Sequence, residues 1–149
     1  MSASGAILIA VLMAIAALHL YWGFGGVWPG GGADSLRATV VGTARGAMPG
    51  LALCALVAGA LAAAAAIVCA RHSPLIEGPL RLVLLAGYAV LILVFAARGL
   101  APYVSPVFEY ARGQPFFALN LWLYAPLCLA LAGLLILDFP RGARAGEAL

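Results

Sequence analysis

Charged side chains are scarce in this sequence: eight arginines, no lysine and five acidic residues make up 9% of its 149 residues. A soluble domain contains about a quarter charged residues, so this shortage excludes an ordinary water-soluble fold. It also excludes a nucleic-acid partner, because such binding needs basic residues gathered on a solvated face. The arginines lie instead at the ends of apolar segments and in the loops, as expected for anchors at a membrane interface.

Motifs for metals, phosphates and disulfides are also missing. Cys54, Cys69 and Cys128 are isolated and form no C-x-x-C pair, which argues against a zinc site or a disulfide framework. The glycine run 30–32 lacks the lysine and the preceding strand of a phosphate-binding loop. The sequence therefore predicts neither a cofactor nor a metal ion.

Long segments without any charged residue dominate the chain, and hydrophobic residues make up 66% of it. A helix of roughly 20 residues crosses the hydrocarbon layer of about 30 Å. The charge-free segments cover residues 1–33, 46–70, 82–97 and 113–137. The sequence predicts an all-α fold, a four-transmembrane-helix bundle with up-down topology, surrounded by membrane lipids.

Glycine, proline and arginine set the expected helix boundaries. We expect one transmembrane domain over residues 1–140 and a mobile tail over residues 141–149. The first helix is expected to be retained rather than cleaved as a signal peptide, because no basic residue precedes it and its apolar character continues past Ala16. The expected helices cover about residues 6–24, 47–70, 81–98 and 115–137.

Small residues recur in the second expected helix, where Ala55, Gly59 and Ala63 are four residues apart. Small side chains let membrane helices approach closely. We therefore expect this stripe to face the bundle interior.

The distribution of arginines does not decide the orientation, because four lie on each side of the membrane in this topology. The compact basic loop with Arg71 and Arg81 favours a location of both termini in the cytoplasm.

One end of the expected bundle collects most of the candidate functional side chains, whereas the opposite end is expected to be poor in polar groups. His19 and Asn120 each lie about five residues from a helix end, so both are about 7 Å below the interface. We predict that His19 is within hydrogen-bond reach of helix four, directly or through one water, and that this layer borders the main cavity. The ligand-binding candidates are His19, Trp22, Arg98, Glu109, Asn120 and Tyr124.

Polar groups inside a membrane are functional candidates by default. His19 is the candidate catalytic residue, as a general base, proton relay or ligand, and the alternative is a structural hydrogen bond to Asn120, Tyr124 or a backbone carbonyl. Arg98 is either an interfacial anchor or a partner of Glu109. These alternatives stay open at the level of sequence.

Two short motifs resemble a known family. They are HLYWGFGG at residues 19–26 and FALN at residues 117–120, the latter followed by YAPLCL at residues 124–129. The chain is similar to an uncharacterised bacterial family of small four-helix integral membrane proteins, a domain of unknown function. The resemblance implies the fold and the inner (cytoplasmic) membrane of a bacterium, and it implies no activity.

Three functions of different classes remain. The leading hypothesis is binding of a small apolar or lipid-like molecule at the polar-rimmed end of the bundle. The second is a lipid-modifying or isomerising enzyme that uses His19, although no carboxylate lies in the apolar segments to pair with it. The third is an accessory subunit that forms an oligomer or packs on a partner membrane protein. A small molecule that copurifies with the protein distinguishes the first two from the third.

Overall fold

The computed structural model describes residues 1–73 and 75–144, and this part of the chain contains helices and loops but no strand. Four helical stretches are long and apolar enough to cross a membrane, with mean hydropathy between 2.0 and 2.6. The predicted all-α fold with four transmembrane helices is confirmed, and the chain is a multi-pass membrane protein. The first three stretches are α1 (Ala3–Gly23), α3 (Leu51–Arg71) and α4 (Gly78–Val104).

The fourth stretch, Pro115–Phe139, is not one regular helix. It consists of α5 (Pro115–Leu119), the π-helical turn η2 (Asn120–Tyr124) and α6 (Ala125–Arg144). The last helix thus continues beyond the predicted end at residue 137, and residues 145–149 of the expected tail lie outside the described residues. Two short helices occupy the loops, α2 (Ala33–Val40) and the 3₁₀ helix η1 (Pro106–Ala111).

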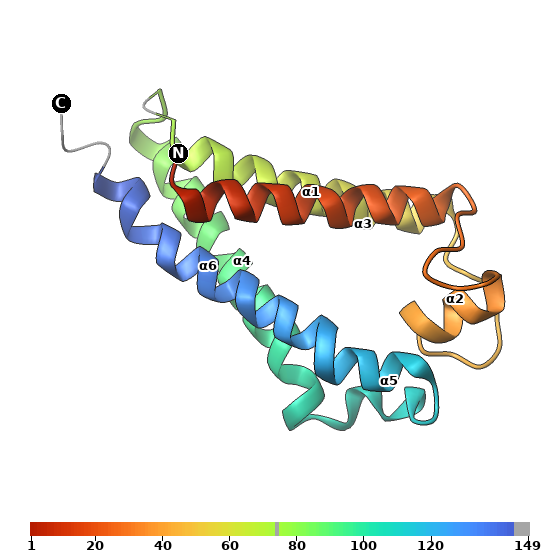
Figure 1. Ribbon diagram of the computed structural model, residues 1–149. Coiled ribbons are helices and arrows are strands. Elements are labelled where there is room, and N and C mark those ends of the chain that lie inside the picture. Colours follow the sequence, from red (N-terminus) through yellow and green to blue (C-terminus); the bar gives the residue numbers. More distant parts are fainter. Residues whose placement is uncertain (74, 145–149) are drawn as a thin grey trace.

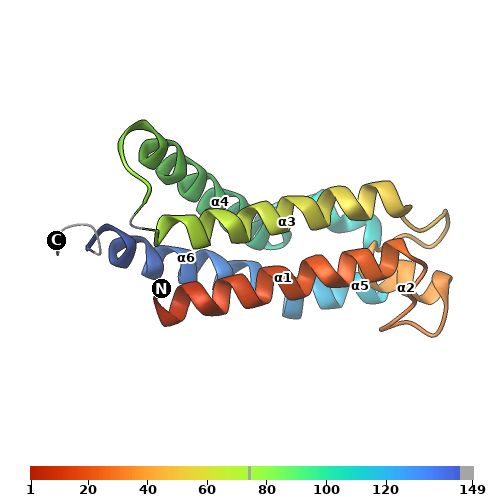
Figure 2. The same ribbon diagram turned by 90° about the horizontal axis from the view of Figure 1, so that it is seen from above.

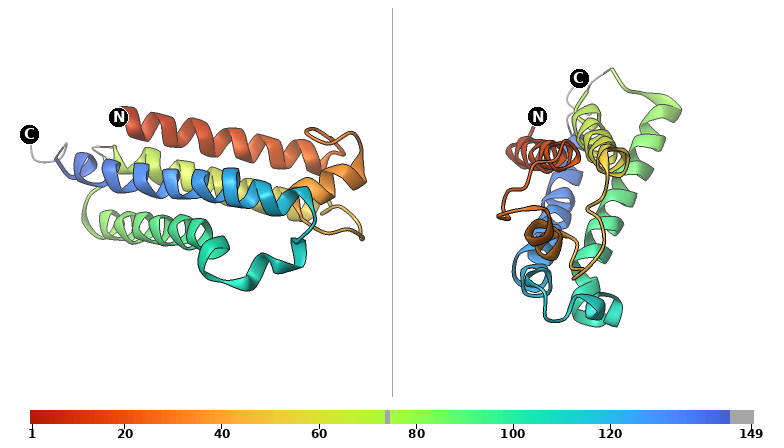
Figure 3. Two further views of the ribbon diagram at one scale, coloured as in Figure 1. Left: turned by 60° about the horizontal axis from the view of Figure 1, so that its bottom comes forward. Right: turned by 90° about the vertical axis from the view of Figure 1, so that its right-hand side faces the viewer.

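The four long helices form two antiparallel pairs. α1 packs mainly on α3, and α4 packs mainly on α6. Figure 1 shows that the pairs lie close together near the N-terminus and diverge toward α2 and α5, and Figure 2 shows α1 beside α3 from above. In the end-on view of Figure 3, α1 (red) and α3 (yellow) lie side by side, and α4 (green) and α6 (blue) extend away below them. We call the two ends the closed end and the open end.

The packed core lies toward the closed end, where all four long helices contribute to it. Leu8, Val68, Tyr88 and Leu135, from α1, α3, α4 and α6 in turn, are each completely buried in one cluster. Because lipid is as apolar as these side chains, close van der Waals packing and polar contacts hold such helices together.

The small-residue stripe of α3 does not face the interior, contrary to expectation. Gly59 is exposed, and a Cβ atom built there would meet nothing within 4 Å. Cys54, Ala58 and Ala65 are buried instead. Successive residues of a helix are rotated by about 100° around its axis. The stripe begins at Ala55, one residue after the buried Cys54, and therefore points away from the buried row.

α4 and α6 approach each other closely at Gly99. A Cβ atom at this position would lie 2.7 Å from Leu129 Cγ and 3.0 Å from the carbonyl oxygen of Ala125. Only glycine leaves room for this contact. The contact also fixes where along the helix axis Arg98, the preceding residue, meets η2.

Pro126 explains the irregular turn that precedes α6. In η2 the N–H of Ala125 donates to the carbonyl of Asn120, five residues back. Pro126 has no N–H, so the next carbonyl in this register, that of Leu121, lacks a helical donor. Tyr103 of α4 supplies one, because its hydroxyl donates to Leu121 O. Such π turns are frequent at functional sites.

Candidate functional site

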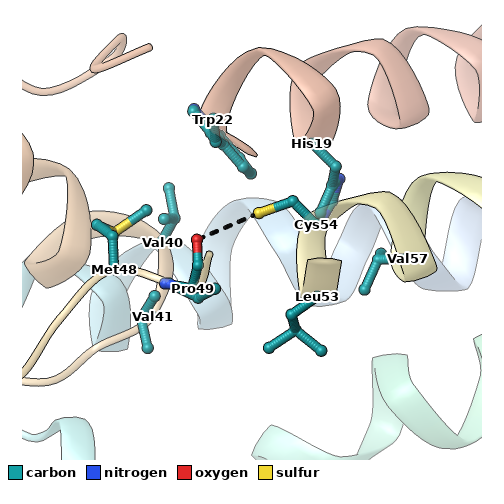
Figure 4. A pocket seen from close by; sticks show the side chains of 9 residues that line it. All are labelled: His19, Trp22, Val40, Val41, Met48, Pro49, Leu53, Cys54 and Val57. Atoms are coloured by element: carbon teal, nitrogen blue, oxygen red, sulfur yellow. Dashed lines mark hydrogen bonds between the residues drawn. The ribbon is translucent and has the colours of Figure 1, made fainter. Parts of the chain in front are cut away.

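A cavity of about 140 Å³ lies at the open end, beneath the loop that joins α1 to α3. Its walls are mainly apolar, with one imidazole and one thiol among them, and the Cys54 thiol lies 3.5 Å from the carbonyl oxygen of Pro49. Figure 4 shows the side chains around this space. They are His19 and Trp22 of α1, Val40 and Val41 at the end of α2, Met48 and Pro49 of the loop, and Leu53, Cys54 and Val57 of α3.

His19 is held by its own helix. Its Nδ1 lies 2.8 Å from the carbonyl oxygen of Ile15, and since a carbonyl only accepts hydrogen bonds, Nδ1 is the protonated nitrogen. In the neutral ring Nε2 then carries a free lone pair. The ring meets Trp22 edge to face, with centroids 5.2 Å apart. Among the described residues no direct hydrogen bond joins His19 to helix four, because the helix pairs diverge at this end, and the partner observed is the alternative, a backbone carbonyl.

Arg98 and Asn120 form a second polar contact, between α4 and η2. Arg98 Nη2 donates to Asn120 Oδ1 over 2.8 Å. The Phe108 ring of η1 covers the guanidinium, whose carbon is 4.7 Å from the ring centroid. Two buried nitrogens in this contact, Arg98 Nη1 and Asn120 Nδ2, have no hydrogen-bond partner among the described residues.

Glu109 does not pair with Arg98, so this one of the two alternatives for Arg98 is wrong. Its carboxylate accepts two hydrogen bonds from Arg112, of 2.6 and 2.8 Å. The two residues are three positions apart in and beside a 3₁₀ helix, where such side chains lie directly above one another. The hydrogen bond and charge of Arg112 lower the pKa of Glu109, and Glu109 in turn raises the pKa of Arg112.

Tyr124 connects the helix pairs at the open end. Its hydroxyl donates to Thr39 O over 3.2 Å, and the hydroxyl of Tyr110 donates to Val41 O over 3.0 Å. Both bonds attach the end of α2 and the segment after it to the second helix pair. His19, Asn120 and Tyr124 therefore have separate partners rather than forming one layer, and only His19 lines the cavity.

The closed end contains a polar cluster that sequence reasoning missed. Asp138 of α6 is completely buried, and four side chains surround it. Its Oδ1 accepts hydrogen bonds from Ser2 and from Ser4, the latter over 3.1 Å. Its Oδ2 lies 3.0 Å from His72 Nε2 and 2.7 Å from the Tyr88 hydroxyl. The expectation that this end is poor in polar groups is wrong.

Two sequence signals point to this cluster. Leu131, Leu135 and Asp138 are buried at positions i, i+4 and i+7, so Asp138 continues the core-facing row of α6 instead of ending the helix. Gly5 makes room for the contact, since a Cβ atom there would lie 3.0 Å from His72 Nε2 and 3.3 Å from Asp138 Oδ1. The cluster joins the ends of α1, α3 and α6 to the first half of α4.

Metal binding has no obvious site in the part of the chain that the structure describes, where no group of three or more histidine, cysteine and acidic side chains lies close enough to hold an ion.

Comparisons with known proteins agree with the expected resemblance. No curated protein and no solved structure matches this chain. The model of one protein family matches residues 12–135, a range that reaches from α1 into α6. The chain therefore belongs to the family described as protein of unknown function (DUF3995).

Proposed function

We propose that this membrane protein binds a small apolar or lipid-like molecule in the cavity beside His19. The observation that carries the proposal is the cavity of about 140 Å³ with mainly aliphatic walls. An apolar cavity of about 150 Å³ is known to stay dry and to accept benzene. The space therefore suits one ring or a short stretch of an acyl or isoprenoid chain.

The polar groups of the cavity favour an amphipathic ligand. His19 Nδ1 is occupied by Ile15 O, which leaves Nε2 to accept a hydrogen bond from a ligand hydroxyl or amide. A single polar group in an apolar pocket orients a ligand without adding much to its affinity. Trp22, packed against the imidazole at 5.2 Å between centroids, adds a flat apolar wall.

Binding is better supported than catalysis at this site. A general acid or base usually works with a second polar group that orients or complements it. Among the described residues no acidic side chain lines the cavity, and the buried carboxylate of Asp138 contacts the other histidine, His72. An enzyme of the isomerase type would need a further acid supplied by the substrate or by water.

Native mass spectrometry of the protein extracted with its lipids tests the proposal. We expect a bound small molecule on the wild type and its loss from Val57→Phe, which fills the cavity. The matched control is Leu56→Phe, at a neighbouring side chain that is 69% exposed, and it should retain the molecule. Equal retention by both variants would contradict the proposed site, and a copurifying protein in place of a small molecule would favour an accessory subunit.

We also propose the inner membrane of a bacterium as the setting, with both termini in the cytoplasm. The compact basic loop with Arg71 and Arg81 supports this orientation.

A further inference from the structure

Arg98 is a charged residue with incomplete surroundings, because its buried Nη1 has no hydrogen-bond partner among the described residues. The salt bridges in the described part of the chain join Arg37 to Asp34, His72 to Asp138 and Arg112 to Glu109. None of them includes Arg98, whose hydrogen-bond partner is the neutral amide of Asn120. Within the described residues, therefore, no carboxylate neutralises its positive charge.

The depth of Arg98 makes this charge significant. α4 has 27 residues, so it is about 40 Å long and exceeds the hydrocarbon thickness of about 30 Å. Arg98 lies six residues before the end at Val104, about 9 Å along the axis. When α4 is centred in the membrane, the Cα atom of Arg98 lies a few Å below the boundary between hydrocarbon and headgroups. An ionised side chain at this depth requires a counter-charge or hydration.

Unused donors surround the same charge. Asn120 is 1% exposed, and because its Oδ1 accepts from Arg98, its Nδ2 is a donor group only. Neither this Nδ2 nor Arg98 Nη1 has a partner within the described residues. Buried polar groups are almost always hydrogen-bonded. The contact thus offers surplus N–H donors and a positive charge, and it lacks an acceptor with several lone pairs.

We propose that Arg98 and Asn120 bind a phosphate oxyanion, supplied by the headgroup of an anionic phospholipid or by free phosphate. Arginine binds phosphate through its N–H groups. The guanidinium carbon of Arg98 lies over the Phe108 ring, 4.7 Å from its centroid. Both unused nitrogens are covered by protein, so the anion enters when the η1 segment around Phe108 shifts.

The site is separate from the His19 cavity, because neither Arg98 nor Asn120 lines that cavity. Loss of anion binding would leave the proposed apolar ligand in place, and the reverse also holds.

The first experiment compares lipids retained by the detergent-solubilised protein in native mass spectrometry, using phosphatidylglycerol and phosphatidylcholine as probes. We expect wild type to retain phosphatidylglycerol preferentially. Arg98→Gln should bind phosphatidylglycerol about tenfold more weakly, which corresponds to roughly 1.4 kcal/mol. The control is Arg112→Gln, which removes an exposed arginine that has its own carboxylate partner. Unchanged phosphatidylglycerol binding by Arg98→Gln would overturn the proposal.

A second variant keeps the test valid if Arg98→Gln does not fold. Asn120→Asp places a carboxylate beside the guanidinium and supplies the missing anion from within the chain. We expect this variant to melt higher than wild type in phosphatidylcholine, and to lose any response to anions.

The source of the anion is identified by adding either sodium phosphate or phosphatidylglycerol to wild type in phosphatidylcholine and measuring the melting temperature. A rise in melting temperature with sodium phosphate identifies a free anion, and a rise only with phosphatidylglycerol identifies a lipid headgroup. Either rise, absent from Asn120→Asp, supports the site. No rise with either probe, or an equal rise in Asn120→Asp, would refute it.

Discussion

Asp138 is the residue on which the closed end depends most. Ser2, Ser4, His72 and Tyr88 all contact its carboxylate, and these residues come from the start of the chain, the end of α3 and α4. A buried carboxylate with this many partners is stable in place, but its removal takes away the acceptor that these side chains share.

Replacement of Asp138 should therefore destabilise the protein strongly. We expect Asp138→Leu to reduce the free energy of unfolding by about 3–5 kcal/mol, because it deletes one member of a buried hydrogen-bonded pair. Tryptophan fluorescence during thermal unfolding in detergent measures the effect. The control is Asp34→Asn, whose side chain is 91% exposed beside Arg37 and should change stability by at most about 1 kcal/mol. Equal melting temperatures for both variants would show that the cluster does not hold the helices.

Glu109 should give a small pH dependence with a defined sign. Arg112 lowers the pKa of Glu109 in the folded protein, so the pair contributes stability fully above the unfolded value of about 4.3. This contribution disappears as the pH falls through the lower folded value. We expect wild type to melt slightly above Glu109→Gln at neutral pH, and the two curves to converge on acidification. A difference that grows toward acid pH would contradict the pairing.

The candidate residues were easier to identify from the sequence than their contacts. His19 and Trp22 line the cavity, and Arg98 contacts Asn120, all of which belong to the predicted set. Counting residues from a helix end gives depth, but it does not give the direction of a side chain around the helix. Counting also does not reveal that the helix pairs diverge at the open end, which leaves His19 without a direct hydrogen bond to helix four among the described residues. Asp138 was missed because it was interpreted as a helix end.

At the scale of the helix, the charge-free segments located all four membrane spans but not their packed faces. An amphipathic helix shows its buried face as a periodic apolar stripe, whereas α1 and α3 are apolar on every side and show none. On α3 the packed face was therefore predicted from the small residues alone. Their stripe, Ala55, Gly59 and Ala63, is exposed instead. The π turn η2 was also not predicted, although Pro126 indicated a disturbed hydrogen bond.

Two glycines in helix interiors should respond oppositely to the same substitution. In Gly99→Ala the new methyl group would lie 2.7 Å from Leu129 Cγ and 3.0 Å from a backbone oxygen of α6. We expect a loss of about 1–3 kcal/mol from this overpacking. Gly59→Ala meets nothing within 4 Å and should gain up to about 1 kcal/mol of helix propensity. Chemical unfolding in mixed micelles compares the two, and a tolerated Gly99→Ala would mean that α4 and α6 separate more easily than their contact suggests.

For the whole molecule, four spans require that the second and third connections lie on opposite sides of the membrane. Single cysteines at Leu75, which is 90% exposed, and at the exposed Ser105 test this after Cys54, Cys69 and Cys128 are replaced by alanine. With the termini in the cytoplasm, we expect an impermeant maleimide added outside intact cells to label Ser105→Cys only. Labelling of Leu75→Cys alone would reverse the orientation, and labelling of both would contradict four spans.

The bonds that join the helix pairs at the open end have a consequence for sequence variation. Tyr124 and Tyr110 donate to the carbonyl oxygens of Thr39 and Val41, which are main-chain atoms that a change of side chain at these positions does not remove. Val40 and Val41 also form part of the cavity wall. Substitutions at Val40 and Val41 can therefore enlarge, shrink or reshape this wall while Tyr110 and Tyr124 keep the scaffold assembled.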